Sequence, residues 1–341
     1  MISLAFAMCI SYKVCMEDQY GRNIDYLRIS VTDRCNLRCI YCMPKEGIEW
    51  LPHKDILSYE ELVHLVRLLA SMGIHRLRLT GGEPLVRTDL PDLISALHAV
   101  DGIDEINLTT NGILFSPMAR DLLDAGVHGI NFSLDTLSST TFQRITRTDR
   151  FADARGAIDK ALELGFARVK VNCVPVQGIN DGEISAIAAL AKDQPVDVRF
   201  IEMMPIGCGK NFKPVTMTEV YQALERVYGP AAVYTGQLGN GPASYVAFPG
   251  FQGHVGFIGA LTHTFCSQCN RIRLTAEGYL KLCLHYSTGT DLRAPLRQGR
   301  SDEEICQIIS DAIFHKPDHH RFSEAAQHIS VEQHNMNAIG G

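Results

Sequence analysis

Cys35-Asn36-Leu37-Arg38-Cys39-Ile40-Tyr41-Cys42 directly follows a short β-rich run at Tyr26–Val31. Three thiols so close in sequence can bind one metal cluster from a single loop. A four-iron cluster with three protein ligands keeps one iron open, as a zinc site with three protein ligands can bind water. The spacing differs from the Cys-x2-Cys-x2-Cys run of electron-carrying ferredoxins. It indicates chemistry on a bound ligand, although three nearby cysteines could also bind zinc.

Beyond this loop, β-rich runs alternate with helical stretches as far as residue 201. The predicted strands are Tyr26–Val31, Arg76–Thr80, Glu105–Thr110, Gly129–Leu134, Arg168–Pro175 and Val196–Ile201. The predicted helices are Tyr59–Met72, Leu90–Val100, Pro117–Ala125, Asp153–Leu164 and Glu183–Lys192. This alternation implies a parallel sheet, either doubly wound or closing into a barrel. Polar residues recur at the ends of the strands, which favours a barrel with its catalytic groups on the loops after the strands.

The pattern changes after about Pro205. One helix is predicted at Met217–Val227 and a last one at Asp302–Phe314, with short strands between them. These strands are Ala232–Thr235, Ser244–Phe248, Val255–Ile258, Ile272–Thr275 and Tyr279–Leu282. We expect a smaller extension packed onto the barrel. The predicted division is an N-terminal segment at 1–20, disordered or preceding a true start near Met16, a barrel at 21–235 and the extension at 236–341.

Charge and cysteine usage narrow the class of protein. The formal net charge of −6 gives no support for nonspecific binding to nucleic acid, which needs a basic face. No apolar run reaches the roughly 18 residues of a membrane-spanning helix, and no basic segment precedes the apolar Leu4–Ile10. Of 11 cysteines, most fall into two triads, while Cys9 and Cys15 have no evident role. Clustered thiols without an export signal indicate metal ligands in a reducing compartment, so we expect a cytoplasmic protein.

Further candidate residues lie at the ends of strands. Thr80-Gly81-Gly82-Glu83-Pro84 ends the second predicted strand, and its glycines allow backbone to approach a ligand, with a carbonyl or Glu83 receiving an ammonium group. The alternative is a glycine turn leading into a helix. Ser133 ends the fourth strand and Met204 follows the sixth.

A second triad lies in the extension. Cys266-Ser267-Gln268-Cys269 is followed by thirteen residues and then Cys283, and His285 or His263 could complete a zinc site. A second iron–sulfur cluster with an open iron is the other interpretation.

Arginines next to this triad indicate an anionic ligand. Strand alternation puts Arg271 and Arg273 on one side, and two guanidinium groups on one face suit phosphate, although a solvated face would look the same. Arg28, Arg78 and Lys170 lie within predicted barrel strands, where cations are costly unless paired. We therefore expect a ligand such as a triphosphate inside the barrel mouth.

The cysteine loop resembles that of the radical S-adenosylmethionine (SAM) superfamily, and from Gly21 to Gly341 the chain resembles the GTP 3′,8-cyclase family of molybdenum cofactor biosynthesis. The matching stretches are Leu27–Arg34, Thr80–Pro84, Leu108–Gly112, Asn131–Asp135, Arg199–Glu202, the second triad with its arginines, and Gly340-Gly341. The resemblance implies an incomplete TIM-type barrel of six strand–helix units, an α/β fold, with a C-terminal extension carrying a second cluster at the opposite mouth.

The resemblance also implies site residues and cofactors, namely two 4Fe–4S clusters and SAM. The first cluster would be held by Cys35, Cys39 and Cys42, the second by Cys266, Cys269 and Cys283. SAM would contact Tyr41, Gly82, Ser133 and Met204. GTP would be bound by Arg28, Arg78, Thr109, Lys170, Arg271, Ile272 and Arg273, mainly through its triphosphate. Gly340 and Gly341 would reach into the active site, whereas a terminal glycine pair without this context would be a frayed end.

The implied reaction is that of a lyase that converts GTP to (8S)-3′,8-cyclo-7,8-dihydroguanosine 5′-triphosphate. A 5′-deoxyadenosyl radical from SAM would take the hydrogen at C3′ of the ribose. The implied partners are an external electron donor and cyclic pyranopterin monophosphate synthase, and the implied state is a monomer or homodimer.

Two other functions remain open at this point. A peptide-modifying radical enzyme would often carry further cysteines near the C-terminus, and none follows Cys306. A protein with structural zinc sites that binds a partner or nucleic acid is the third interpretation.

Overall fold

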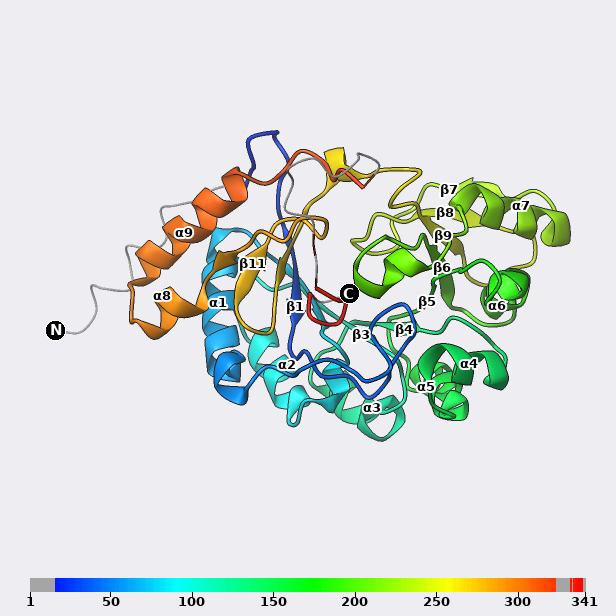
Figure 1. Cartoon of the computed structure of the whole chain (residues 1–341), viewed down its shortest axis with the longest axis horizontal. Coiled ribbons are helices and arrows are strands. Elements are labelled where there is room, and N and C mark those ends of the chain that lie inside the picture. Colours follow the sequence, from blue (N-terminus) through cyan, green and yellow to red (C-terminus); the bar gives the residue numbers. More distant parts are fainter. Residues whose placement is uncertain (1–15, 323–331, 333, 340–341) are drawn as a thin grey trace.

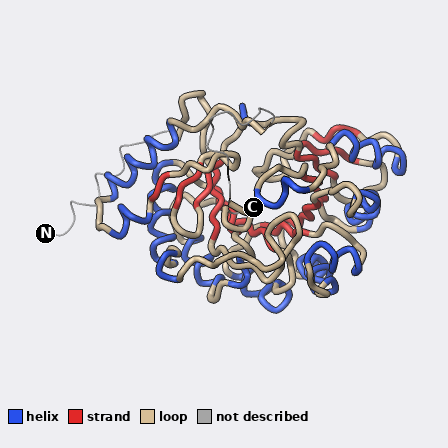
Figure 2. The backbone as a smooth tube through the Cα atoms, in the orientation of Figure 1, coloured by secondary structure: helices blue, strands red, loops and turns tan. Residues whose placement is uncertain are grey.

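A single twelve-stranded sheet organises the computed structural model of the chain, which describes residues 16–322, 332 and 334–339. Cys9, Cys15, Gly340 and Gly341 lie outside the described residues. In Figure 2 the strands form an inner arc and most helices lie around its outside. None of the described helices has both the length and the apolar character needed to cross a membrane.

Six consecutive parallel strands form the centre of the sheet. They are β1 (Tyr26–Ser30), β2 (Arg76–Thr80), β3 (Glu105–Thr110), β4 (Gly129–Ser133), β5 (Arg168–Cys173) and β6 (Asp197–Ile201). The helices between them are α1 (Tyr59–Met72), α2 (Leu90–His98), α3 (Phe115–Asp124), α4 (Ser139–Thr146), α5 (Phe151–Glu163) and α6 (Ile184–Asp193). All the predicted strands and helices of this region are confirmed to within a few residues, and α4 is an addition. The result is a mostly parallel α/β sheet consistent with a partial TIM barrel.

Alternation along each strand separates a polar inner face from an apolar outer one. In β2, Leu77 and Leu79 are fully buried in the core beneath the helices, while Arg76, Arg78 and Thr80 point the other way. The same alternation holds in β1, where Leu27 and Ile29 join the core. The apolar face supplies the hydrophobic driving force for docking the helices, so the polar face is left to line the interior.

The C-terminal strands extend the same sheet at both edges. Its order is β12-β11-β10-β1-β2-β3-β4-β5-β6-β9-β8-β7. The added strands are β7 (Ala232–Tyr234), β8 (Ser244–Ala247), β9 (Val255–Ile258), β10 (Arg271–Leu274), β11 (Tyr279–Lys281) and β12 (Thr290–Asp291). Strand β9 runs parallel beside β6, and β10 runs parallel beside β1. The predicted extension therefore prolongs the barrel wall. Its helices are α7 (Met217–Tyr228), α8 (Arg293–Arg297) and α9 (Asp302–Phe314), of which the short α8 was not predicted.

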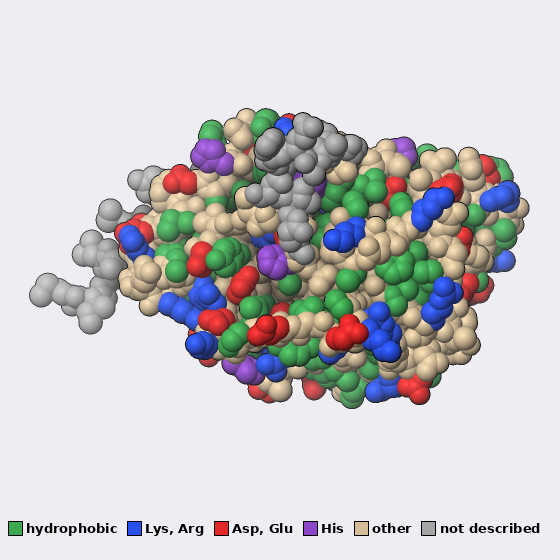
Figure 3. Space-filling model, in the orientation of Figure 1, with side chains coloured by type: hydrophobic (Ala, Val, Ile, Leu, Met, Phe, Trp, Pro, Cys, Tyr) green, Lys and Arg blue, Asp and Glu red, His purple; other side chains and the backbone are tan. Residues whose placement is uncertain are grey.

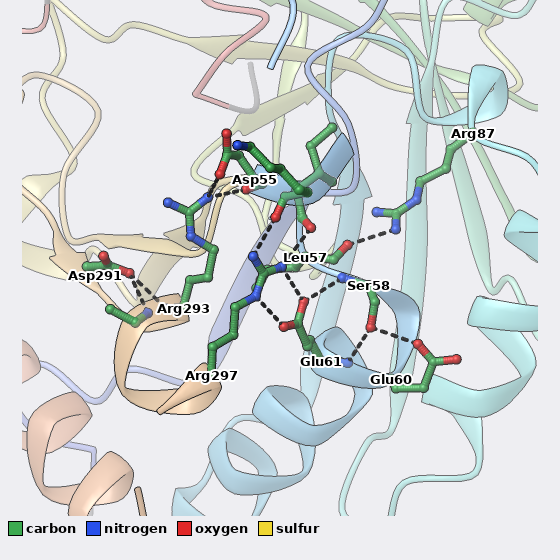
Figure 4. Close-up of polar contacts among 12 residues, drawn as sticks. Asp55, Leu57, Ser58, Glu60, Glu61, Arg87, Asp291, Arg293 and Arg297 are labelled. Atoms are coloured by element: carbon green, nitrogen blue, oxygen red, sulfur yellow. Dashed lines mark hydrogen bonds and ion pairs between the residues drawn. The ribbon is translucent and has the colours of Figure 1, made fainter. Parts of the chain in front are cut away.

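A polar network joins α8 to the segment that leads from the first cysteine loop into α1 (Figure 4). The Arg297 guanidinium donates to both carboxylate oxygens of Glu61, at 2.6 and 2.9 Å. Glu61 also accepts the Ser58 amide in the capping box that begins α1. Arg297 further donates to the Ile56 carbonyl at 3.1 Å, and Arg293 contacts Asp55. The C-terminal region thus holds the entry to the barrel's first helix.

Candidate active site

The first cysteine loop begins where β1 ends, at the edge of the sheet where barrel enzymes carry their chemistry. The Cys39 carbonyl accepts the amides of Cys42 and Met43 at 2.9 and 3.1 Å, which closes a tight turn. The Arg38 guanidinium donates to the carbonyls of Cys35 and Leu37 at 2.8 and 2.9 Å. These local bonds present the three thiols from one short segment.

Gly81 and Gly82 pack directly against the backbone that leads into this loop. A Cβ at Gly82 would lie 2.3 Å from the Arg34 carbonyl oxygen, and one at Gly81 would lie 2.5 Å from the Thr32 carbonyl oxygen. The Gly82 amide donates to Thr32 at 2.8 Å. Any larger residue would push the cysteine loop away, so the first requirement for glycine here is contact between two segments of backbone.

Glu83 is engaged within the protein. The residue is 1% exposed. Its carboxylate accepts the Leu85 amide at 3.1 Å, the Thr110 hydroxyl at 2.7 Å and the Asn111 amide at 2.7 Å. Burial raises the pKa of this carboxyl to about 7. Glu83 therefore ties the glycine turn to the end of β3.

The chemistry of the first triad fits an iron–sulfur cluster. Burial raises the pKa of Cys35 to about 11 and that of Cys42 to about 12, and it raises the pKa of Cys39 well above its usual range. Three adjacent thiolates therefore need cations of a bound cluster to balance them. None of the described cysteines is paired in a disulfide. Over the described parts of the chain, no three His, Cys, Asp or Glu side chains form a site for a single metal ion.

The residues expected to contact SAM lie at the same end of the sheet. Tyr41 belongs to the cysteine loop, Ser133 is the last residue of β4, and Met204 follows β6. The Tyr41 hydroxyl donates a short hydrogen bond to Asp135, whose pKa burial raises to about 6. A Cβ at Gly209 would lie 2.7 Å from the Met204 carbonyl oxygen and 3.8 Å from that of Tyr41, so these two segments are neighbours.

The inner face of the sheet carries a row of cations in register. Arg28 of β1 is paired with Arg273 of β10 on one side and with Arg78 of β2 on the other. Further along the sheet, Lys170 of β5 lies between Asn131 and Asp197. Side chains at paired positions project from the same face. The arginines and the lysine that the sequence predicted inside the barrel are therefore brought onto one wall.

These cations repel one another. Burial and the neighbouring Arg273 hold the pKa of Arg28 well below its usual range, and burial with Arg271 lowers that of Arg273 to about 10. Burial and the nearby Arg199 lower the pKa of Lys170 to about 7. Guanidinium groups stay charged in proteins, so the lowered pKa values express the cost of burying these cations beside like charges. The wall fits a polyanionic ligand.

One outer face of the molecule shows no comparable row of cations. On the face shown in Figure 3, Lys and Arg side chains are interspersed with Asp and Glu.

The remaining residues predicted to bind GTP are placed differently from one another. Thr109 lies on the inner face, and its hydroxyl is 3.4 Å from both Arg78 and Asn131 nitrogens. Ile272 is fully buried in the hydrophobic core between Arg271 and Arg273, so only its main chain could contact a ligand. Arg199 was not predicted, yet it lies inward on β6 and donates to Asn172 at 2.9 Å. Arg199 lies between the apolar Val198 and Phe200, and this alternation could have identified it as an inward-facing residue.

The second triad lies at the other end of the same strand. Asn270, one residue after Cys269, accepts the amides of Asp25 and Tyr26 at 3.1 and 3.2 Å, where β1 begins. The five residues of β1 span roughly 17 Å. The two triads therefore flank opposite ends of the strand that carries Arg28. His285, a proposed zinc ligand, is packed 4.4 Å from the ring of Phe322.

A cleft opens beside the second triad. Its volume is about 450 Å³, and its lining includes Phe265, Asn270, Arg271 and Tyr245. The glycine-rich segment from Thr235 to Ala243 forms much of its wall. Lys170 makes a short hydrogen bond to the Leu238 carbonyl of this segment and one of 3.1 Å to the Tyr245 hydroxyl. The cation row is thus connected to this opening.

The described part of the C-terminal tail approaches the first triad. The Asn337 side chain donates to the Asp33 carbonyl at 3.1 Å, and its backbone amide is hydrogen-bonded to the Cys42 thiol. Asn335 accepts the Cys208 amide at 3.3 Å. In Figure 1 this red segment lies in the middle of the molecule, close to β1. Gly340 and Gly341, which follow it, lie outside the described residues.

Comparison with known proteins identifies the class. Residues 29–191 match the radical SAM superfamily, and residues 196–322 match a family described as Molybdenum Cofactor Synthesis C. The fold is similar to a crystal structure of SuiB from Streptococcus suis bound to SAM, with a TM-score of 0.59 at 14% identity over 84% of this chain and 68% of that one. The chain therefore has a radical SAM fold.

Curated relatives narrow the assignment. The chain is 47% identical to a GTP 3′,8-cyclase of Desulforamulus reducens, over 96% of this chain and 100% of that one. It is 45% identical to a GTP 3′,8-cyclase of Pelotomaculum thermopropionicum with the same coverage. It is 42% identical to the mouse molybdenum cofactor biosynthesis protein 1, over 89% of this chain and 48% of that one. The chain belongs to the GTP 3′,8-cyclase family, which confirms the resemblance found in the sequence.

Proposed function

We propose that this chain is a radical SAM lyase that converts GTP to (8S)-3′,8-cyclo-7,8-dihydroguanosine 5′-triphosphate in the first step of molybdenum cofactor biosynthesis. The family assignment supports this reaction. The observation that carries it is the placement of two cysteine triads at opposite ends of β1, with a wall of inward cations between them. A nucleoside triphosphate could span such a chamber, with its phosphates on the cations.

The end of the chamber that carries the first triad binds and cleaves SAM. Cys35, Cys39 and Cys42 hold a 4Fe–4S cluster which, when bound, supplies the electron for cleavage of the sulfonium. Tyr41, Gly82, Ser133 and Met204 surround SAM at the strand ends. The Tyr41 hydroxyl is already fixed by Asp135, so its ring position is set before SAM binds. The role of Gly340 and Gly341 at this end of the chamber is part of the proposal, and its support is that the preceding Asn337 donates to the Asp33 carbonyl beside the cysteine loop.

The end of the chamber that carries the second triad binds GTP. Cys266, Cys269 and Cys283 hold a second 4Fe–4S cluster facing the purine. Arg28, Arg78, Lys170, Arg271 and Arg273 bind the triphosphate through their inward nitrogens. Thr109 offers a hydroxyl, and Ile272 contributes its main chain. Fixing both ends of GTP positions the C3′ hydrogen for transfer and keeps water from the reacting atoms.

The overall reaction balances with an external electron donor. The C–S bond of SAM breaks to give methionine, and the C3′ hydrogen of GTP ends on 5′-deoxyadenosine. A C3′–C8 bond forms in GTP. The donor supplies two electrons, one for cleavage and one to reduce the cyclised nucleotide, which also takes up a proton. The product would pass to cyclic pyranopterin monophosphate synthase.

The proposed function is tested by anaerobic incubation of reconstituted protein with GTP, SAM and dithionite. Mass spectrometry should find 5′-deoxyadenosine and the cyclised nucleotide in equal amounts. With C3′-deuterated GTP, the deuterium should appear in 5′-deoxyadenosine. Formation of 5′-deoxyadenosine without deuterium, and with GTP unchanged, would contradict the assignment.

Lys170 makes GTP binding depend on pH. With a pKa of about 7, the free protein loses this positive charge as the pH rises above 7, whereas bound triphosphate favours the protonated form. GTP binding should therefore take up a proton above pH 7, and the Kd should rise by up to about tenfold between pH 7.5 and pH 8.5. Calorimetry in buffers of different ionisation enthalpy measures both quantities.

Lys170→Met should bind GTP more weakly and lose this component of the pH dependence. Lys210→Met, which removes an exposed lysine, serves as the control. An unchanged pH profile in Lys170→Met would mean that Lys170 does not meet the phosphates.

A further inference from the structure

A buried lysine with no role in the proposed reaction lies beneath the second triad. Lys316 follows α9 and is 2% exposed. Its ammonium donates to the Arg271 carbonyl at 3.0 Å and makes a short bond to the Leu282 carbonyl. Arg271 comes two residues after Cys269, and Leu282 directly precedes Cys283. One side chain therefore bridges the two separate segments that carry the cysteines.

The surroundings of Lys316 offer thiols in place of a carboxylate. Among the described residues, no ion pair includes Lys316, and the nearby Asp18 is taken up by Arg22 at 2.5 Å. Burial lowers the pKa of the Lys316 ammonium, and the thiolates of Cys269 and then Cys283 act in the opposite direction. An ammonium has three N–H donors, and two of them serve the carbonyls.

Arg22 joins the same two parts of the chain through further hydrogen bonds. Its guanidinium donates to the carbonyls of Cys266 and Asp318 at 2.8 Å and to that of Pro317 at 2.6 Å. The segment that carries Lys316 is thereby tied to the loop that carries Cys266. Holding a lysine side chain in one position costs side-chain entropy. The hydrogen bonds of the Lys316 ammonium offset that cost.

We propose that Lys316 is a built-in countercation of the second iron–sulfur cluster, a positioning residue that stabilises the reduced, more negative state of that cluster. This inference rests on the proposed function, which places a cluster on Cys266, Cys269 and Cys283. A cluster gains one negative charge on reduction. A buried cation bonded to the two segments that carry the cysteines stabilises the more negative state because the local dielectric is low. Loss of Lys316 should make the second cluster harder to reduce.

The test isolates the second cluster in a parent in which Cys35, Cys39 and Cys42 are all replaced by alanine. Lys316→Met removes charge and donors, Lys316→Gln removes the charge but keeps amide donors, and Lys316→Arg keeps the charge. Each protein is reconstituted, its iron and sulfide are counted, and its cluster is titrated anaerobically with electron paramagnetic resonance as the readout. Lys213→Met, which removes an exposed lysine, is the matched control.

We expect the ease of reducing the second cluster to follow the charge of the side chain at position 316. At the potential where half of the parent cluster is reduced, the ratio of reduced to oxidised cluster should fall at least about tenfold in Lys316→Met and Lys316→Gln. For a one-electron couple this is a shift of about 59 mV to more negative potential. Lys316→Arg and Lys213→Met should stay within about threefold of the parent. A parent-like ratio in Lys316→Gln or Lys316→Met would overturn the proposal.

Failure of assembly is also decisive. If Lys316→Met and Lys316→Gln bind no iron while Lys316→Arg does, the charge is needed for the cluster to form, which supports the proposal. If Lys316→Arg also binds none, the requirement is for the shape of lysine and the proposal fails. If the parent itself holds no iron, the second cluster of the proposed function is wrong, and the inference falls with it.

Discussion

Replacing Cys39 by alanine is expected to abolish the formation of 5′-deoxyadenosine, with a fall of at least about a thousandfold, or about 4 kcal/mol in barrier height. Cys39 is the middle cysteine of the first triad, and its carbonyl closes the turn that presents Cys42. A cluster left with two protein ligands would be lost or left without a defined open iron. Bound iron should fall by about half, because the second triad remains. Mass spectrometry with dithionite as reductant and iron analysis measure the two effects.

The matched control for Cys39→Ala is Cys306→Ala. Cys306 lies on α9 within the extension and belongs to neither triad. This variant should keep its full iron content and its rate of SAM cleavage. Retention of 5′-deoxyadenosine formation by Cys39→Ala would sink the assignment of the first triad.

Replacing Cys269 by alanine is expected to separate the two halves of the reaction. Bound iron should again fall by about half, while reductive cleavage of SAM stays within about threefold of the unchanged protein. Cyclisation of GTP should fall at least about a thousandfold, because the purine loses its docking point roughly 17 Å of strand away from the first triad. The two products are quantified in one assay.

Ser267→Ala provides the control for Cys269→Ala, since Ser267 lies between the cysteines in the same turn. It should keep both products coupled. Normal cyclisation by Cys269→Ala would show that the second triad is not part of the substrate site. Loss of both products would mean that the two ends of the chamber do not act separately.

Much of the fold is predictable because its signals are local. In β2, Arg76 to Thr80 alternate strictly with leucines, and this period of two fixes both the strand and its two faces. The capping box at Ser58 likewise marks the start of α1. The inward orientation of Arg28, Arg78 and Lys170 follows from the same alternation. The position of the first cysteine triad, just after β1, follows from its place in the chain.

Local sequence patterns could not predict the contacts between segments that are distant in the chain. The parallel pairing of β10 with β1 joins residues roughly 245 positions apart, and no local periodicity encodes it. Glu83 looks like an exposed acid in its motif, but the folded chain surrounds it with three donors from β3 and its own turn. Lys316 reads as one more polar residue after a helix. Its burial depends on segments that meet only in the folded protein.

The clustered cations of the inner wall also affect the stability of the folded protein when no substrate is bound. Mutual repulsion among Arg28, Arg78 and Arg273 costs folding free energy that the apolar outer face has to offset. A multivalent anion that enters the barrel relieves that cost and binds only the native state, so it stabilises that state by mass action. Cellular nucleotide supply would then govern not only how fast the enzyme works but also how long each copy of it lasts.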